Sequence, residues 1–337
     1  MLYSAANQLK RERTAEPRPF LVSPDLSIER PLRKQKPSLN SSYLTGTIGQ
    51  ERKFGADLDW EAPAMPTLDP YRITNELDDT ILGVIVTRLE ARGKHPLFDG
   101  MLRDYLDAMD IDSASSVLDM GCGTGVASRH LARRADFPGE ILGIDLSPYL
   151  AETAKKLATE EGLNGRLQFR AGDSHSLDLE DETFNAVVLH TLLSHVSDPL
   201  AVLGEAKRVA KPGSMIGVFD GDFASLTFEQ EDPAKSKADS EKLINAMITQ
   251  PRVMRQIPRL AKRVGLELVK VFPYVLAETG KADFWTPGIE SLRTLLPKSG
   301  EMSEPEAQAW VAEQLEASEQ GVFFGASNFY GYVLKRT

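Results

Sequence analysis

The sequence predicts an α/β fold built on a mostly parallel sheet. From residue 116 onward, apolar runs of strand length alternate with amphipathic runs of helix length, a pattern typical of parallel strands connected by helices. The run from Phe184 to His190 is almost continuously apolar, as expected for a strand that is buried on both faces. A glycine-rich turn follows the first apolar run, so the predicted order there is strand, glycine loop, helix.

The glycine loop lies within the stretch Ser116 to Arg129, SVLDMGCGTGVASR, where Asp119 precedes Gly121, Gly123 and Gly125. Glycines at alternate positions let the backbone turn sharply and let a ligand approach the main chain. The amides at the start of the next helix suit an anionic group, and the acid before the loop suits an amino group. The stretch therefore predicts a site for the zwitterionic end of an amino acid, although a tight turn without a ligand has the same pattern.

Two further polar positions follow the next predicted strands. The apolar run ILGI ends in Asp145, twenty positions after Gly125, where a carboxylate could hold the two hydroxyls of a ribose. The following strand ends at Ala171 and leads into Asp173 and Ser174. Ligands of open α/β sheets gather at this edge, and a solvent-facing loop aspartate is the alternative for Asp173.

Five segments resemble, in content, order and spacing, the class I S-adenosylmethionine-dependent methyltransferases: VLDMGCGTG, GIDLSP, AGDSHSL, FNAVVLHTLLSHVSDP and VAKPGSMIGVFD. Within that family the pattern is most similar to the ubiquinone- and menaquinone-biosynthesis type and its small-molecule relatives. The resemblance implies a seven-stranded, doubly wound sheet with an antiparallel last strand, an N-terminal helical cap and an inserted helical lid. It also implies S-adenosylmethionine as methyl donor, no metal, and direct in-line displacement onto an O, N, S or C atom of a small acceptor.

The resemblance assigns parts of the cofactor to particular residues. Asp119 and the loop glycines would hold the methionine end, Asp145 the ribose, and Asp173 with Ser174 the adenine amino group. The complete set of cofactor-binding residues that it implies is Asp119, Gly121, Gly123, Gly125, Asp145, Leu146, Asp173, Ser174 and His190.

Three side chains at predicted strand ends are candidate catalytic groups. His190 ends its strand and His195 follows on the next loop, where a neutral imidazole could take the acceptor's proton at pH 7. Alternatively, His195 braces the loop while His190 lines the cofactor pocket; no third residue lies at a spacing that suits a metal site. Asp220 and Asp222 follow the fifth strand and could orient the acceptor, with one as base, or could instead bond loop amides.

Two amphipathic helices are predicted before the first strand. Thr74 or Asn75 would cap the first helix, which runs to Glu90, and the second covers His95 to Met109. In the resembled family, helices at this position cover the cofactor. Arg72, just ahead of them, could meet the cofactor carboxylate or form an exposed salt bridge.

The chain divides into three predicted parts: an irregular, basic, proline-containing arm at 1–66, a helical cap at 67–110 and the methyltransferase-like domain at 111–337. The prolines of the arm exclude a long helix, and we expect the arm to be mobile or to contact a second subunit in a homodimer; a transit peptide is the alternative reading. Insertions at about 223–258 and 277–320 are expected to shape the acceptor pocket. Candidate lining residues, several of which also suit the core, are Phe223, Phe228, Met254, Tyr274, Phe284 and Trp285.

The amino-acid composition limits the kinds of substrate and partner that the protein can have. The net charge is −10, and residues 54–337 alone carry 29 basic and 44 acidic side chains, which argues against a nucleic-acid substrate and for a small one. Cys122 is the single cysteine, so no intramolecular disulfide or cysteine-rich metal site can form. With no apolar run of 18 residues and no secretory signal pattern, we expect a soluble, cytoplasmic protein without a membrane partner.

Two alternative functions are compatible with parts of this sequence pattern. An NAD(P)-dependent oxidoreductase would also use a glycine loop followed by an acid, but its usual pattern is G-x-G-x-x-G, whereas this loop reads GCGTG followed by Val126. A catalytically silent regulatory protein that binds S-adenosylmethionine would keep the cofactor residues and lack an acceptor pocket.

Overall fold

The computed structural model describes residues 69–163 and 165–337. The predicted basic arm at 1–66 and its contact with a second subunit lie outside the described residues. Within the described part of the chain, no helix combines the length and the apolar composition needed to cross a bilayer.

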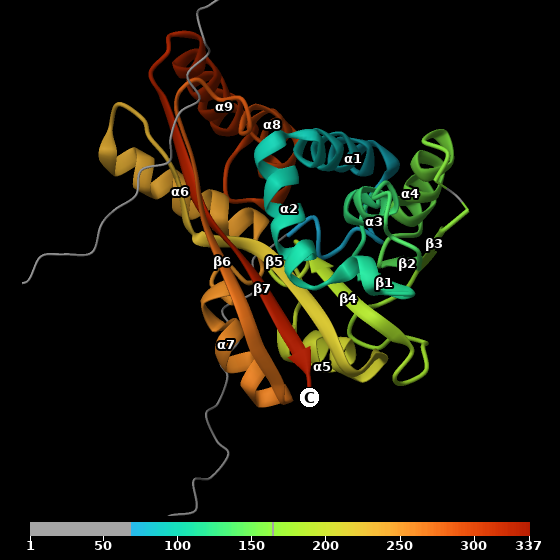
Figure 1. The fold of residues 1–337 in the computed structure, drawn as a ribbon. Coiled ribbons are helices and arrows are strands. Elements are labelled where there is room, and N and C mark those ends of the chain that lie inside the picture. The colour runs from blue at the N-terminus through green and yellow to red at the C-terminus, as the bar shows by residue number, and fades with distance from the viewer. Residues whose placement is uncertain (1–68, 164) are drawn as a thin grey trace, which may run out of the picture. The chain divides into compact units, whose positions relative to one another are not determined.

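A seven-stranded sheet forms the centre of the fold, with the strand order β3-β2-β1-β4-β5-β7-β6 (Figure 1). Strand β7 is antiparallel to both of its neighbours, β5 and β6, and the other paired strands are parallel. The predicted mostly parallel sheet with an antiparallel last strand is therefore confirmed. The strands are β1 Ser116–Met120, β2 Glu140–Asp145, β3 Leu167–Ala171, β4 Phe184–His190, β5 Ala210–Phe228, β6 Leu266–Gly280 and β7 Phe323–Arg336.

Helices pack on both faces of this sheet (Figure 1). Proline in the first turn begins α2, α4, α5 and α6, where its missing N–H costs no hydrogen bond. The helices are α1 Asp79–Lys94, α2 Pro96–Ala108, α3 Val126–Ala132, α4 Pro148–Glu160, α5 Pro199–Val209, α6 Pro233–Met247, α7 Val253–Val264, α8 Thr286–Ser299 and α9 Glu304–Glu319, with a short 3-10 helix at Ile111–Ser113.

Side chains of β4 show how the sheet is buried from both sides. Ala186 and Val188 belong to the core cluster that includes the cap helices α1 and α2. Val187 and Leu189 belong to the cluster beneath α5 and α7. Successive side chains of a strand point to opposite faces, so the nearly continuous apolar run reflects two cores separated by one sheet.

The predicted cap of the first helix is wrong. The helix begins at Asp79, and Asp78 is its N-cap, with a side chain that accepts hydrogen bonds from the amides of Thr80 and Ile81. Aspartate is among the best N-cap residues, and it lies directly before the first helical turn. Thr74, four residues earlier, is buried and lines a cavity.

Strand β5 is longer than the sequence predicts. We expect it to end at Phe219 with two acids in the loop beyond, yet it continues to Phe228. Antiparallel pairing with β7 extends β5 beyond Phe219. Asp220 lies opposite Tyr330, and Thr227 lies opposite Ala326 after a register shift. Because a late strand supplies the partner, the local sequence does not show where β5 ends.

Candidate active site

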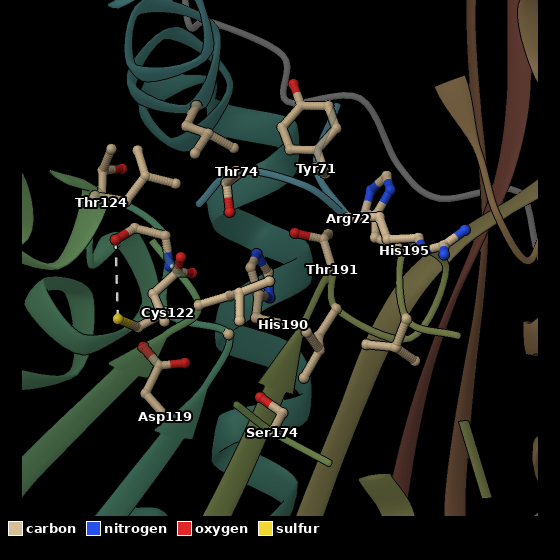
Figure 2. Close-up of a pocket in the computed structure, with 18 of the residues that line it drawn as sticks. Tyr71, Arg72, Thr74, Asp119, Cys122, Thr124, Ser174, His190, Thr191 and His195 are labelled. Atoms are coloured by element: carbon tan, nitrogen blue, oxygen red, sulfur yellow. Dashed lines mark hydrogen bonds between the residues drawn. The ribbon is translucent and has the colours of Figure 1, made fainter. Parts of the chain in front are cut away.

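A cavity of about 350 Å³ opens at the carboxyl ends of the parallel strands (Figure 2). The strand order reverses between β1 and β4, and ligands of open α/β sheets bind at such a switch point. Loops that follow β1, β2, β3 and β4 line the cavity together with residues of the cap. The predicted site residues that line it are Asp119, Gly121, Gly123, Asp145, Leu146, Asp173, Ser174, His190 and His195.

The glycine loop requires glycine for both conformation and space. Gly121, Gly123 and Gly125 have φ values of 68°, 55° and 78°, which side chains with a Cβ rarely adopt. A Cβ on Gly121 would lie 2.5 Å from a Leu192 carbon, and one on Gly125 would lie 2.9 Å from the ring of Phe169. Gly125 does not line the cavity but shapes the turn into α3.

Asp119 carries a carboxylate oxygen without a partner. Its side chain is buried; Oδ2 accepts a 2.5 Å hydrogen bond from Ser128 Oγ, and Oδ1 has no partner among the described residues. Burial raises the pKa of Asp119 to about 7. A buried oxygen that bears negative charge and lines the cavity fits a cationic group such as the ammonium of a methionine moiety.

Asp145 is fixed by two backbone amides. Its Oδ2 accepts from Gly123 N at 2.8 Å and its Oδ1 from Ser147 N at 2.9 Å. Burial raises the pKa of Asp145, and these two bonds oppose the shift. Each oxygen retains capacity for another donor, so the carboxylate fits the two hydroxyls of a ribose.

Asp173 and Ser174 lie at the next strand end. The Asp173 side chain is 55% exposed, and its Oδ1 accepts from the amide of His175 and lies 2.7 Å from the ring Nδ1 of that residue. Partial burial acts to raise the pKa of Asp173, but the bonds to His175 outweigh it and lower that pKa. Ser174 is buried against the cavity.

His190 is a neutral imidazole in an aromatic setting. Burial, and then the charge of Arg92, hold its pKa well below 6.5. Its Nδ1 lies 3.0 Å from the Tyr105 hydroxyl, and its ring stacks on Phe219 at 4.9 Å. The other nitrogen, Nε2, has no partner among the described residues.

His195 is held by a carboxylate that the sequence analysis did not single out as a site residue. His195 Nδ1 lies 2.9 Å from Asp69 Oδ2, and the Asp69 side chain is fully buried. Thr249 donates its amide and its hydroxyl to the same oxygen at 2.9 and 2.8 Å, and Tyr71 N donates to Oδ1 at 3.0 Å. A carboxylate on Nδ1 orients the ring and leaves Nε2 available for a substrate.

Comparison with known proteins fits this geometry. A family described as a methyltransferase domain matches residues 111–265, the segment that holds the glycine loop and all the strand ends lining the cavity. Residues 111–265 thus carry a methyltransferase domain. The predicted resemblance is therefore confirmed at the level of the family.

Individual relatives cover parts of the chain. An uncharacterized 37.1 kDa protein in transposon TN4556 of Streptomyces fradiae is 31% identical over 69% of this chain and 66% of its own length. A demethylmenaquinone methyltransferase of Staphylococcus saprophyticus is 37% identical over 32% of this chain and 45% of its own length. The solved YcgJ protein of Bacillus subtilis has the same fold, with a TM-score of 0.50 and 17% identity over 70% of this chain and 98% of that one. The match to the methyltransferase of known name thus spans less than half of that relative.

Asp220 lies outside the methyltransferase cavity. Its buried side chain accepts hydrogen bonds from Ser194 N, Ser194 Oγ and Gly221 N at 2.9, 3.0 and 2.8 Å. Asp222 accepts from Arg255 Nε at 2.8 Å. Asp220 thus bonds loop amides, one of the two alternatives, and fixes the loop that carries His195, whereas Asp222 pairs with the Arg255 side chain.

The residues expected to line the acceptor pocket do not line this cavity. They pack in the core or, for Tyr274, bond Asp104 through the hydroxyl. Tyr71, Arg72 and His195 instead form the end of the cavity farthest from Asp119 and Thr124 (Figure 2). The candidates in question are Phe223, Phe228, Met254, Tyr274, Phe284 and Trp285.

Arg92 is a further cavity residue that the sequence analysis did not identify. Its Nη2 donates to Thr191 Oγ1 at 2.9 Å, and its guanidinium carbon lies 4.8 Å above the Phe98 ring. Burial lowers its pKa to about 10. Thr191 has a φ of 57°, and such a backbone in a β-branched residue is typical of a functional site.

Proposed function

We propose that the protein transfers the methyl group of S-adenosylmethionine to a small-molecule acceptor that loses a proton. One observation carries this proposal: a single cavity is lined by Asp119, Asp145 and Asp173 from three strand ends, and by the Asp69-bonded His195. The three aspartates suit a cofactor, and the His195–Asp69 pair suits a substrate that must be deprotonated.

The cofactor would be held by residues at the strand ends. Asp119 would receive the methionine ammonium, Asp145 the ribose hydroxyls, and Asp173 with Ser174 the adenine amino group, while Leu146 and His190 line the same space. The unpartnered oxygen of Asp119 and the glycine turns support this assignment. When bound, S-adenosylmethionine supplies an electrophilic methyl group on a positively charged sulfur.

The residues of the chain would position the nucleophile and accept one proton from it. The enclosing loops exclude water and hold the acceptor in line with the methyl. His195 would take the acceptor's proton at Nε2, and Asp69 would stabilise the imidazolium that results. Because a thioether has no proton to lose, this pair favours an oxygen, nitrogen or acidic carbon as the methylated atom.

Two observations support an organic small molecule as acceptor. The described cavity is small, and the chain's net charge of −10 disfavours nucleic acid. Similarity to a demethylmenaquinone methyltransferase is in keeping with this class.

Calorimetric titration with S-adenosylmethionine and with NADH tests the proposal. We expect binding of S-adenosylmethionine only, weakened at least tenfold in Asp145→Ala and unchanged in the control Asp136→Ala, whose aspartate is exposed and outside the cavity. Release of S-adenosylhomocysteine with acceptors from a metabolite extract tests transfer. Binding of NADH alone would indicate an oxidoreductase, and cofactor binding without release across the extract would indicate a silent binding protein.

A further inference from the structure

We propose that the acceptor is an anion, whose carboxylate or phosphate is received by Arg88 and Arg92 beside Tyr71. This inference rests on the proposed function, because Tyr71 and Arg92 line the acceptor end of the same cavity, and Arg88, which is not a lining residue, adjoins it through the Tyr71 ring. It adds the chemical class of the substrate.

Two arginines of the cap helix α1 lie close together, and neither forms a salt bridge with another described residue. Arg88 and Arg92 are four residues apart and so project from the same side of the helix. Within residues 69–163 and 165–337, neither has a carboxylate in salt-bridge range: Arg88 Nη1 is buried without a partner, and Arg92 donates only to a threonine hydroxyl. In a chain with ten more acids than bases, two adjacent unpaired guanidinium groups are unexpected unless a ligand supplies the negative charge.

Neutral donors accompany the two cations. The Tyr71 hydroxyl and His190 Nε2 are both buried without a partner in the described part of the chain, and both residues line the cavity. His190 is only 8% exposed; when the Tyr105 hydroxyl donates to Nδ1, Nε2 carries the remaining hydrogen. Guanidinium, hydroxyl and imidazole N–H groups are the donors that bind oxyanions.

The cofactor's methionine carboxylate could neutralise one of the two guanidinium groups. Asp145 and Asp173, which line the same cavity, are assigned to the ribose and the adenine, and Asp69 is engaged by the His195 ring and by Thr249. In the described part of the chain none of these acids forms a salt bridge with Arg88 or Arg92, so an anionic acceptor would be the direct partner of the second guanidinium.

Tyr71 links the cationic group to the proposed base. Its ring lies 5.5 Å from the Arg88 guanidinium carbon and 4.7 Å from the His195 ring. An anion held beside Tyr71 would place neighbouring atoms of the same molecule near His195. The acceptor class is thus a small acid whose nucleophilic atom lies a few bonds from its anionic group.

The test uses simple probes on the full chain saturated with S-adenosylhomocysteine. Calorimetry would compare benzoate and phenyl phosphate with the neutral benzamide. We expect at least one anion to bind ten times more tightly than benzamide, and the tighter of the two identifies the anionic group. Arg88→Gln should remove this preference and change S-adenosylhomocysteine affinity by less than threefold, while the control Arg103→Gln, which removes an exposed arginine charge on α2, should keep it.

Arg88→Lys gives a second variant in case the glutamine change disturbs folding. It keeps the charge, so a preference for anions should survive in weaker form. Equal binding of all three probes, no binding of any, or an unchanged preference in Arg88→Gln would overturn the inference while leaving the proposed function intact. Failure of S-adenosylhomocysteine to bind the unaltered protein would instead contradict the proposed function.

Discussion

Asp119 shows most directly how a single residue can serve binding at the expense of stability. The buried carboxylate has one oxygen bonded to Ser128 and the other without a partner among the described residues, and desolvation raises its pKa to about 7. The ionised form is therefore costly in the protein without a ligand. A cationic ligand group would remove that cost, so the same feature favours cofactor binding.

Asp119→Asn should separate these two effects. Because the folded-state pKa lies above the unfolded value near 3.8, Asp119 destabilises the ligand-free protein increasingly as pH rises from about 4 to about 7, and fully above that. The variant should unfold at higher temperature than the unaltered protein at pH 8, by an amount that shrinks toward pH 5, while binding S-adenosylmethionine at least tenfold more weakly. Calorimetric melting and titration measure both. A variant less stable at pH 8, or one with unchanged affinity, would contradict this role.

His195 and Asp69 act together in the proposed proton transfer. Once an acceptor is known, His195→Gln should lower kcat by about 10²-fold, in the range typical of a lost general base, and leave cofactor affinity within threefold. Asp69→Asn should lower kcat in the same direction, because the ring loses the carboxylate that stabilises its charged form. Steady-state kinetics with parallel binding titrations measure this. Equal loss of cofactor binding in both variants would indicate that the pair only braces the loop.

At the residue scale, the sequence could predict those site residues that lie at the end of a strand. Asp119 and Asp145 directly follow apolar runs, Asp173 lies two positions after the strand that ends at Ala171, and all three line the cavity. Asp69 could not be found in this way, because it lies 126 positions from His195 and only the packing of the cap brings the two together. Arg92 could not be predicted as a site residue for the same reason, because in the sequence it is one of several polar residues on an amphipathic helix.

The glycine loop is the element whose shape most directly positions the residues proposed to bind the cofactor. Gly121 N and Cys122 N donate to Ile144 O at 2.8 and 3.0 Å, which ties the loop to the end of β2. Gly121→Ala would force a Cβ to within 2.5 Å of Leu192 at a φ of 68°. We expect a loss of about 1–3 kcal/mol in unfolding free energy and at least tenfold weaker S-adenosylmethionine binding, measured by chemical denaturation and titration. Gly162→Ala, with a φ of 71° but open space, controls for backbone strain alone and should leave the affinity unchanged.

Arg129 connects three helices around the site. This buried guanidinium of α3 pairs with Glu90 of α1 at 2.5 Å and with Glu161 at the end of α4. Arg129→Met would leave two carboxylates without their shared cation, and removal of one partner from a buried pair typically costs about 3 kcal/mol or more. Hydrogen exchange should become faster in α1, whereas Arg133→Met, at a half-exposed arginine that also pairs with Glu161, should have little effect. Unchanged exchange in α1 would show that packing alone holds the cap.

At the element scale, the sequence predicts strands better than their ends. The sequence predicts all seven strands in order, and the buried central strands are the clearest because each is an apolar run bounded by turns. It misplaces the end of β5, since pairing with the distant β7 extends that strand beyond Asp220. It also misplaces the start of α1, where several capping residues precede one amphipathic run and Asp78 is the one that bonds the first turn.

For the whole molecule, the strand order determines where the site lies. The reversal between β1 and β4 brings the glycine loop and the His195 loop to one cavity, and the cap supplies Tyr71, Arg72 and Arg92 to its other side. The family match covers the strand ends at residues 111–265, whereas the segments before and within α1 lie outside it. The residues at the acceptor end of the cavity are consequently the ones that the sequence predicts least well.

A crystal structure with S-adenosylhomocysteine tests the central claim most directly. We expect the amino group of the ligand at Asp119 Oδ1, its ribose hydroxyls at Asp145, and its sulfur facing the side of the cavity formed by Tyr71 and His195. A ligand bound elsewhere, or one whose sulfur faces away from His195, would contradict the account.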